Sequence, residues 1–204
     1  DLTPFLEQEP EFRSRFVPAI WGLYEYFDGV WILPAVISPY LTFYNRNHFQ
    51  EAGMEYPDGT WRWDTEVEIA ARRLRVVDDA GRVTRYGVLL ENRLPTALFS
   101  NGGEIINAEG TRSLLAEPAV VDMMTMFQEW RQQDLIPVLG DKRGPFERQE
   151  GSIQLVMGTF AMYRYAEHSD LNWGIAEVPL GDAGRQIEEN TWGFAIHKDS
   201  PNAE

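Results

Sequence analysis

The sequence predicts an α/β fold, in which strands and helices alternate along the chain. Segments with the apolar pattern of strands are separated by segments with the pattern of helices throughout, which favours this class over an all-α or all-β fold. Residues 40–45, YLTFYN, are aromatic or aliphatic on both faces of an extended segment, as expected of a strand covered on both sides. The 204 residues are 44% hydrophobic, enough to bury a core in one large domain or two small ones.

The first strands are expected to follow an N-terminal helix. This helix covers residues 9–26 and ends before a turn at Asp28-Gly29. An apolar strand over residues 29–37 comes next, and we expect Pro34 to interrupt it. The strand over residues 40–45 completes a pair of consecutive extended segments.

A short helix and a longer one come next. Phe49 and Ala52 lie on one face of the short helix, and Gly53 ends it in a left-handed conformation. The longer helix opens near Asp64. Its expected buried face consists of Val67, Ala70, Ala71 and Leu74. A strand over residues 85–90 follows it after a turn.

The second half of the chain alternates in the same way. A short helix ends at Gly102-Gly103, and a longer helix has Pro118 in its first turn. The apolar stripe of that longer helix is expected to pack in the core: Val120, Met123, Met124, Phe127 and Trp130. An amphipathic helix over residues 146–157 is closed by Gly158. Three further strands are expected over residues 159–165, 172–178 and 191–197.

Composition and charge exclude several kinds of partner and site. The net charge is −14, with no basic cluster, so a nucleic-acid backbone would be repelled. The absence of Cys excludes disulfides, thiolate metal sites and cysteine nucleophiles. The three histidines, His48, His168 and His197, lack metal-ligand spacing, so neither a metal nor a cofactor is expected.

No enzyme motif is present in the sequence. It contains no G-x-S-x-G, P-loop, G-x-G-x-x-G or H-E-x-x-H pattern. Adjacent carboxylates such as Glu188-Glu189 or Asp78-Asp79 could serve as the acid and base of a glycosidase. In polar turns of an acidic protein, however, adjacent carboxylates are usually solvated.

The aromatic content is the first indication of function. Seven Trp occur among 204 residues, and aromatic, amide and charged residues adjoin the strand ends: Tyr40, Glu91, Asn92, Arg93, Trp173 and Trp192. Sugars bind with their apolar ring faces on aromatic side chains and their hydroxyls on polar groups. Trp61, Trp63 and Trp130 are interpreted as packing residues. Trp192 has the best claim to bind a sugar, because Gly193 beside it has no side chain to cover the ring.

Landmarks along the whole chain resemble the family 1 extracellular solute-binding proteins, the sugar-binding receptors of ABC importers that include maltose-binding protein. No single landmark is specific, but seven occur in the expected order. They are DLTPFLEQEPEF, GVWILPAVISPYLTFYNRNHFQEAGM, TWRWDTEVEIAARRL, RYGVLL with FSNGGEIIN, LVMGTFAMYRY, WGIAEVPLGDAG and NTWGFAIHKDSPNAE.

The resemblance implies a type II periplasmic-binding-protein-like lobe with hinge-crossing strands and an incomplete first lobe. Residues 1–40 would be part of lobe one leading into the hinge, residues 41–189 lobe two, and residues 190–204 the return crossing. The segments 29–45 and 190–197 should therefore lie side by side. Family members are about twice this long, as two domains of ordinary size require, so the sequence resembles a central fragment.

The resemblance also implies ligand-binding residues. Ser38 and Tyr40 would border the cleft, and Glu91, Asn92 and Arg93 would reach ligand hydroxyls from an exposed loop. Trp192 would stack on a sugar at the return crossing. After Ala161-Met162 the chain departs from the Gly-aromatic pattern of many relatives, and Tyr165 or His168 is expected to supply that aromatic platform.

The implied function is non-catalytic capture of a sugar or oligosaccharide and its delivery to the membrane permease subunits of an ABC transporter. Such a protein would be periplasmic or extracellular, held at the cell surface by a lipid anchor on a missing N-terminus. A carbohydrate-active hydrolase would instead place two carboxyls about 5–9 Å apart across a cleft. A plain acidic interaction domain would instead expose a large apolar patch.

Overall fold

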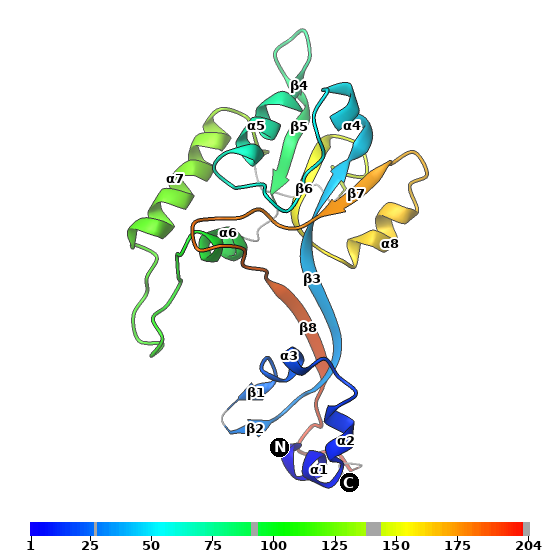
Figure 1. Cartoon of the computed structure of the whole chain (residues 1–204), viewed down its shortest axis with the longest axis vertical. Coiled ribbons are helices and arrows are strands. Elements are labelled where there is room, and N and C mark those ends of the chain that lie inside the picture. Colours follow the sequence, from blue (N-terminus) through cyan, green and yellow to red (C-terminus); the bar gives the residue numbers. More distant parts are fainter. Residues whose placement is uncertain (27, 91–93, 138–143, 202–204) are drawn as a thin grey trace. The chain divides into compact units, whose positions relative to one another are not determined.

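The computed structural model describes residues 1–26, 28–90, 94–137 and 144–201. The chain divides into two compact units. Unit 1 consists of Asp1–Ser38 and Glu189–Glu204, and unit 2 of Pro39–Glu188. The chain therefore passes between the units twice, once at Ser38-Pro39 and again at Glu188-Glu189. Figure 1 labels the helices and strands of both units.

Unit 2 is built on a mixed sheet. The strand order is β4-β5-β6-β3-β7, where β5 and β6 are parallel and β3 is antiparallel to both β6 and β7. The bounds are β3 Leu33–Asn45, β4 Val76–Val77, β5 Val83–Leu90, β6 Gly151–Gly158 and β7 Trp173–Ala176. The α/β class predicted from the sequence is confirmed.

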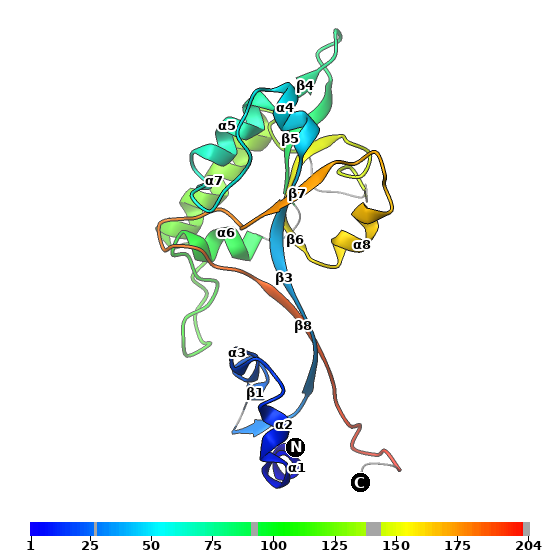
Figure 2. The same ribbon diagram turned by 45° about the vertical axis from the view of Figure 1, so that its right-hand side comes forward.

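Helices cover both faces of this sheet (Figures 1 and 2). Helices α5, α6 and α7 contribute to the larger hydrophobic core, whereas α8 contributes to a smaller core that includes Phe43 and Phe146. The helices of unit 2 are α4 Arg46–Glu51, α5 Glu66–Arg73, α6 Leu94–Ser100, α7 Pro118–Gln132 and α8 Ala161–Ala166. Within the described residues, no helix is long and apolar enough to span a lipid bilayer.

A bulge interrupts the pairing of β3 with β6. Tyr40 pairs with Gly158 and Leu41 with Met157, but Phe43 pairs with Gln154, so β6 holds one extra residue. Val156 lies in this stretch with φ of 53°, a left-handed conformation that is unfavourable for a β-branched residue. The bulge changes which face the following side chains meet: Leu155 and Val156 belong to the larger core and Met157 to the smaller.

Several predicted elements are confirmed. Helix α5 buries Val67, Ala70 and Ala71, and Leu74 directly after it is also buried. Gly53 ends the segment after α4 with a positive φ. The predicted stripe of α7 is correct except for one residue. Val120, Met123, Phe127 and Trp130 are buried, while Met124 is exposed.

The predictions for residues 146–165 are wrong. The expected helix over 146–157 is the strand β6, and the expected strand over 159–165 contains helix α8. Ser152 and Gln154 gave β6 the polar pattern of an amphipathic helix, yet all eight of its residues are buried. The Ser152 hydroxyl is satisfied there by His48 Nδ1 at 3.0 Å. The spacing of apolar residues in a sequence cannot tell a polar residue that is buried with a partner from one that is exposed to solvent.

The N-terminal helix and the first strand break also differ from expectation. In place of one helix over 9–26, the chain forms the short helices α2 and α3 and the strand β1, and Pro10 and Pro18 start the two helices. Strand β3 runs through Pro34 without interruption. Proline is tolerated where a strand needs no hydrogen bond from that residue.

Unit 1 has a small core. Leu2, Leu6, Trp21 and Val30 are its buried members. Strand β8 pairs with β3, which confirms that the segments 29–45 and 190–197 lie side by side. The elements of the unit are α1 Thr3–Gln8, α2 Pro10–Arg13, α3 Pro18–Trp21, β1 Glu25–Tyr26, β2 Gly29–Val30, the first part of β3, and β8 Glu189–Phe194.

Candidate functional site

The edge of the unit 2 sheet where β6 ends is also where both crossing segments meet that unit. Thr159 N donates a hydrogen bond to Pro39 O at 3.2 Å, and Tyr40 N donates one to Glu188 O at 3.2 Å. Because β5 runs parallel to β6, its carboxyl end lies at the same edge. Loops at the carboxyl ends of strands are a common place for ligands in α/β proteins. We call this edge the β6 edge.

Two exposed aromatic side chains lie at the β6 edge. Phe160, between β6 and α8, is 46% exposed, and Tyr163 in α8 is 81% exposed. A Cβ atom at position 158 would lie 2.4 Å from the Phe160 ring, so Gly158 is required for that ring to rest on the end of β6. Solvent-facing rings on a rigid strand–helix junction suit stacking on an apolar ligand face.

The residues predicted to border the ligand fall into three groups. Ser38 and Tyr40 are buried members of β3, and Tyr40 packs in the larger core. Glu91, Asn92 and Arg93 lie outside the described residues, between β5 and α6, so the prediction that they are exposed stays a prediction. Tyr165 and Trp192 form the third group, in which Tyr165 is buried and Trp192 is exposed.

Tyr165 is a core residue in this structure. Its side chain is 0% exposed. Its ring centroid lies 4.9 Å from that of Phe146, 5.1 Å from that of Phe43 and 6.1 Å from that of Trp173. A ring covered in this way could meet a ligand only after leaving the cluster. His168, the other candidate for this platform, is exposed beyond the end of α8.

Trp192 in β8 is 66% exposed. Its Nε1 donates a hydrogen bond to Asn190 Oδ1 at 2.7 Å, and its carbonyl oxygen accepts one from Tyr24 Oη at 2.9 Å. The structure gives a different reason for glycine at position 193 from the one inferred from the sequence. A Cβ there would lie 2.3 Å from Ile32 and 2.4 Å from the Leu33 carbonyl, so glycine is needed for β8 to approach this segment.

The segment before the return crossing is fastened within unit 2. We call residues 177–188 the strap. Leu180 N donates to Trp61 O at 2.7 Å, and Leu180 O accepts from Trp63 N at 3.1 Å. Arg185 Nη2 donates to Gly59 O at 2.6 Å and Nε to Val178 O at 2.8 Å. The strap is thus held against the loop before α5.

Helix α6 supplies a second anchor for the strap. The buried Ser100 hydroxyl accepts a hydrogen bond from Gln186 N at 3.1 Å and donates one to Thr96 O at 2.7 Å. Ser100 O accepts from Ala183 N at 2.8 Å. A Cβ at Gly181 would lie 2.3 Å from Ser100 O, which shows how closely the two backbones approach.

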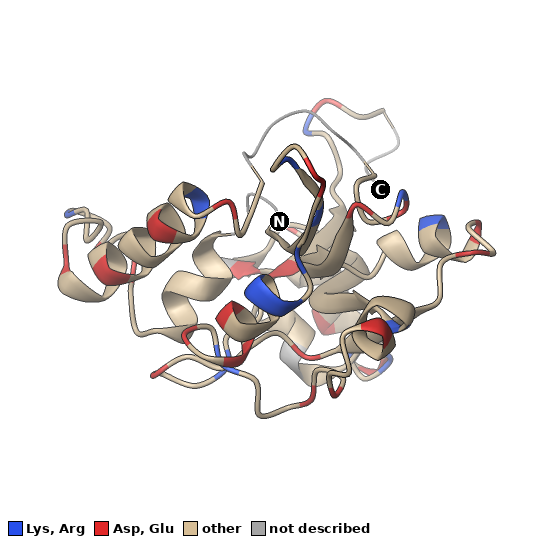
Figure 3. Cartoon of the chain, turned by 90° about the horizontal axis from the view of Figure 1, so that it is seen from above, with Lys and Arg blue, Asp and Glu red and all other residues tan. Residues whose placement is uncertain are grey.

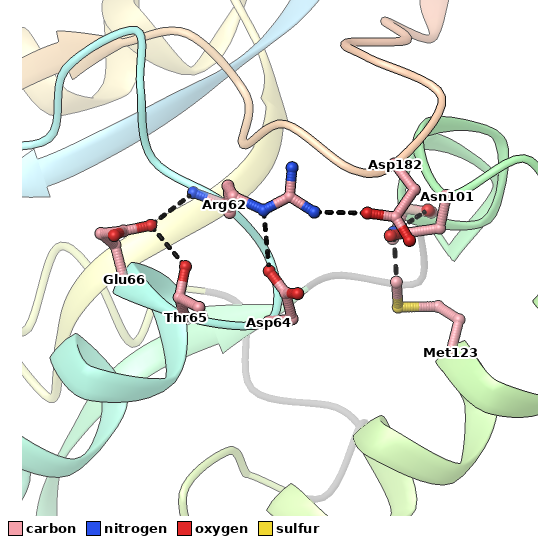
Figure 4. Close-up of polar contacts among 8 residues, drawn as sticks. Arg62, Asp64, Thr65, Glu66, Asn101, Met123 and Asp182 are labelled. Atoms are coloured by element: carbon pink, nitrogen blue, oxygen red, sulfur yellow. Dashed lines mark hydrogen bonds and ion pairs between the residues drawn. The ribbon is translucent and has the colours of Figure 1, made fainter.

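An ion-pair cluster closes the outer side of the strap (Figure 4). Arg62 donates to Asp182 at 2.5 Å and to Asp64 at 3.1 Å, and these two carboxylates raise the pKa of the guanidinium. The backbone N–H of Arg62 donates to Glu66 Oε2 at 3.0 Å. The Thr65 hydroxyl also bonds Glu66 and is the main cause of the lowered pKa of this carboxyl.

Acidic residues are distributed over many elements (Figure 3). Many are already paired with arginine, as in Glu51 with Arg85 and Glu177 with Arg185. Among the described residues, no three His, Asp or Glu side chains are placed to hold a metal ion. Among the described residues of the β6 edge, the exposed aromatic side chains Phe160 and Tyr163 are the candidates for ligand contact.

Comparison with protein families identifies the chain. The model for bacterial extracellular solute-binding proteins matches residues 1–204. The chain belongs to this family. Proteins of Brucella abortus and Brucella suis are 22% identical to the chain over 187 residues, which cover 85% of it and 44% of their own length. The chain thus spans less than half the length of these relatives.

Solved structures share the fold of this family member. An ABC substrate-binding protein of Listeria monocytogenes in complex with cycloalternan is 22% identical with a TM-score of 0.84, over 98% of this chain and 52% of that one. The GacH receptor of Streptomyces glaucescens, solved without ligand and with acarbose, is 20% identical with a TM-score of 0.75, over 93% and 50%. Maltose-bound MalE3 of T. maritima is 18% identical with a TM-score of 0.74, over 98% and 54%.

Sequence reasoning missed Phe160 and Tyr163 as candidate site residues. Residues 159–165 were expected to form a strand, in which side chains alternate between two faces, so the helix after Gly158 and the exposed rings beside it were not predicted. The available signal was Gly158, which can mark the end of a strand, because α8 has Phe160 at its N-cap and no side-chain cap that the sequence could have shown.

Proposed function

We propose that the full-length protein is a non-catalytic sugar receptor of an ABC importer, with an oligosaccharide as the ligand class. Membership of the solute-binding family is the observation that carries this function. Three fold neighbours are known in complex with cycloalternan, acarbose and maltose, which are carbohydrates. The aromatic character of the β6 edge agrees with a carbohydrate ligand.

Phe160 and Tyr163 are the proposed stacking residues of unit 2. Both rings expose area beside the place where the chain enters and leaves that unit. Trp192 is proposed as a further stacking ring, since its indole N–H is already bound by Asn190 and its faces remain exposed. Ser38 and Tyr40 are retained as proposed residues beside the ligand that act through the position of β3, because both side chains are buried. The segment Glu91–Arg93 is retained as the proposed source of polar groups for sugar hydroxyls.

Tyr165 has a supporting role in this proposal. Its packing against Phe43 and Phe146 fixes α8, and α8 carries Tyr163. A ring held by a rigid helix loses little conformational freedom when a ligand arrives, which favours affinity. Tyr165 would therefore position the platform without touching the sugar.

The two crossings are proposed to form the hinge of the receptor. They join unit 2 to unit 1 at Ser38-Pro39 and Glu188-Glu189. Ligand would shift the full-length protein toward a closed state that the permease subunits recognise. We propose a periplasmic or extracellular location with attachment to the cell surface through a lipid anchor.

A thermal-shift screen of the full-length protein tests the ligand class. A sugar that binds only the folded state stabilises it by about 2.7 kcal/mol at a hundred times its dissociation constant. We expect at least one oligosaccharide in a panel of α- and β-linked sugars to raise the melting temperature. Amino acids and inorganic anions at equal concentration are the control. A response to those compounds, with none to any sugar, would contradict the proposal.

The same sample tests the absence of catalysis. Incubation of the stabilising oligosaccharide with the protein should leave its chain length unchanged when followed by chromatography. Release of shorter sugars would instead favour a carbohydrate-active hydrolase.

A further inference from the structure

Residues 1–204 contain one Asn-Gly pair, Asn101-Gly102, which directly follows helix α6. An Asn side chain that precedes Gly is the one most open to attack by the next backbone nitrogen, because glycine has no Cβ to shield that nitrogen. Gly102 is exposed to solvent, and Asn101 is half-buried. Water and hydroxide therefore reach this pair in the folded protein.

The backbone of this pair forms the Schellman motif that ends α6. Gly102 has a φ of 79°, and its N–H donates a hydrogen bond to Phe99 O at 3.0 Å. The N–H of Gly103 donates to Leu98 O at 2.8 Å, which completes the motif. The nitrogen that would attack Asn101 is thus held in a hydrogen bond. Attack requires this bond to open, and a helix end opens at a lower free energy than the whole fold.

The side chain of Asn101 connects the end of α6 with the strap. Its Nδ2 donates a hydrogen bond to Ala97 O at 2.9 Å and lies 4.0 Å from Met123 Sδ in α7 (Figure 4). A Cβ at Gly181 of the strap would lie 2.8 Å from Asn101 Cγ. The side-chain amide therefore fills the space between the helix end and the backbone of the strap.

We propose that Asn101 is a deamidation site and that its modification releases the strap from α6. The deprotonated nitrogen of Gly102 attacks Asn101 Cγ, a C–N bond forms, and the side-chain nitrogen leaves as ammonia. Water then opens the resulting succinimide at either carbonyl, which gives aspartate or isoaspartate. No electrons are transferred, and water is the only other reactant.

The product of this reaction does not fit the same surroundings. An ionised carboxylate has no proton to donate to Ala97 O, and it places a negative charge beside that carbonyl and beside the strap, where Asp182 is also acidic. Isoaspartate adds a carbon to the backbone, which changes the spacing on which the Schellman motif depends. The residue directly before the modified one is Ser100, which anchors the strap through the N–H groups of Gln186 and Ala183.

Peptide mapping of the full-length protein tests the site without any ligand. The protein is incubated in mildly alkaline buffer with and without denaturant, and mass spectrometry follows the replacement of the Asn101 amide by a carboxyl group. We expect deamidation in native buffer at a rate at least about tenfold lower than in denaturant, since the hydrogen bond of the Gly102 N–H must first open. Absence of deamidation after prolonged native incubation, or equal rates in the two buffers, would overturn the proposal.

Hydrogen exchange of the full-length Asn101→Asp variant tests the effect on the strap, because this substitution reproduces the aspartate product. The N–H groups of Ala183 and Gln186, which are bonded to the end of α6, should exchange at least about tenfold faster than in the parent protein. The N–H of Leu180 is the internal control. It is bonded to the loop before α5 and should exchange at nearly the parent rate.

Asn107→Asp is the matched control variant, because it adds the same charge in the loop between α6 and α7. The Asn107 oxygen accepts hydrogen bonds from the N–H groups of Thr111 and Arg112, and Asp keeps that oxygen. We expect this variant to leave exchange at Ala183 unchanged. Parent-like exchange in Asn101→Asp, or an equal increase in both variants, would overturn the proposal. If Asn101→Asp does not fold, the deamidated form separated from aged native protein by anion exchange serves in its place.

Discussion

At the scale of single residues, exposure separates side chains that the sequence presents as equivalent. Tyr163 and Tyr165 are two positions apart in the same helix, yet one is 81% exposed and the other fully buried. Residues two apart on a helix point in clearly different directions. The two tyrosines therefore have different expected roles, and substitution should separate ligand binding from folding.

Tyr163→Ala should weaken sugar binding by the full-length protein without changing its stability much. Loss of a stacking ring removes about 1–3 kcal/mol of binding free energy, or roughly 5- to 150-fold in affinity. Tyr165→Ala should instead lower the free energy of unfolding by about 3–5 kcal/mol, because it leaves a cavity between Phe43 and Phe146. Isothermal titration and thermal melts check both. The reverse pattern would show that the platform lies elsewhere.

Trp192→Ala gives a third comparison at this scale. A partly exposed ring contributes little to folding before ligand arrives, so we expect a loss of affinity of about 1–3 kcal/mol with a small change in melting temperature. Asn190→Ala is the informative partner variant, because it frees the indole N–H without removing the ring. Unchanged affinity with a large fall in melting temperature would identify Trp192 as a core residue.

His48 links stability to pH. Burial, followed by the charge of Arg85, lowers its pKa to about 4, while Glu51 acts weakly in the opposite direction. Between pH 4 and pH 6.5, therefore, His48 binds a proton in the unfolded state, where its pKa is near 6.5, but not in the folded state. This contribution to stability is complete above pH 6.5 and is lost as the pH falls toward 4. Its full size is about 3 kcal/mol.

His48→Gln should remove this part of the acid sensitivity. The amide of Gln can still bond the Ser152 hydroxyl but does not titrate. Urea titrations between pH 4 and 7 should give a shallower fall in unfolding free energy for the variant than for the parent. The pKa of Glu51 is lowered mainly by its hydrogen bond with Arg85 and the charge of Arg85, which the variant keeps, so most of the acid sensitivity of Glu51 is common to both proteins. Parallel curves would show that His48 is not the group responsible.

At the scale of elements, the strap illustrates how backbone contacts fix a segment that has no regular secondary structure. It contacts the loop before α5 through Leu180 and Arg185, and α6 through Gln186 and Ala183. Buried backbone groups that are paired in this way hold a loop in one conformation. The strap leads directly to the return crossing, so its position determines where that crossing starts.

Gly181→Ala should therefore destabilise the protein severely. The new Cβ would lie 2.3 Å from the carbonyl oxygen of Ser100, and a backbone atom in α6 cannot move aside cheaply. We expect a loss of about 2–4 kcal/mol in unfolding free energy. Gly59→Ala is the control, because its Cβ would meet the exposed end of the Glu177 side chain rather than a backbone atom. Equal effects in chemical denaturation would mean that the strap adjusts freely.

At the scale of the whole molecule, the pattern of two units joined by two crossings is the feature with functional consequence. β8 pairs with β3 on the side of unit 1, and Tyr40 N bonds Glu188 O on the side of unit 2. Paired crossings of this kind suit a hinge. In the full-length protein, saturating sugar should lower the radius of gyration measured by small-angle X-ray scattering. A bound sugar that leaves the scattering unchanged would argue against closure about these crossings.

The fold class and most buried helix faces could be predicted from the sequence, because helical spacing of apolar residues determines them locally. The positions of Val67, Ala70 and Ala71 in α5 are an example. The strand β6 could not be predicted, because its polar residue Ser152 is buried against a partner far away in sequence, His48. The candidate site was only partly predictable for the same reason. Phe160 and Tyr163 became candidates only once the end of β6 was located.

The sequence by itself determined the family, the α/β class and the pairing of the segments 29–45 and 190–197. All three follow from the order of the landmarks along the chain. The tertiary structure decided which aromatic rings are available to a ligand. Tyr163 and Tyr165 share nearly the same local sequence, but neighbours brought by the fold cover Tyr165 and leave Tyr163 exposed. Burial is a property of distant contacts, so local pattern alone cannot assign it.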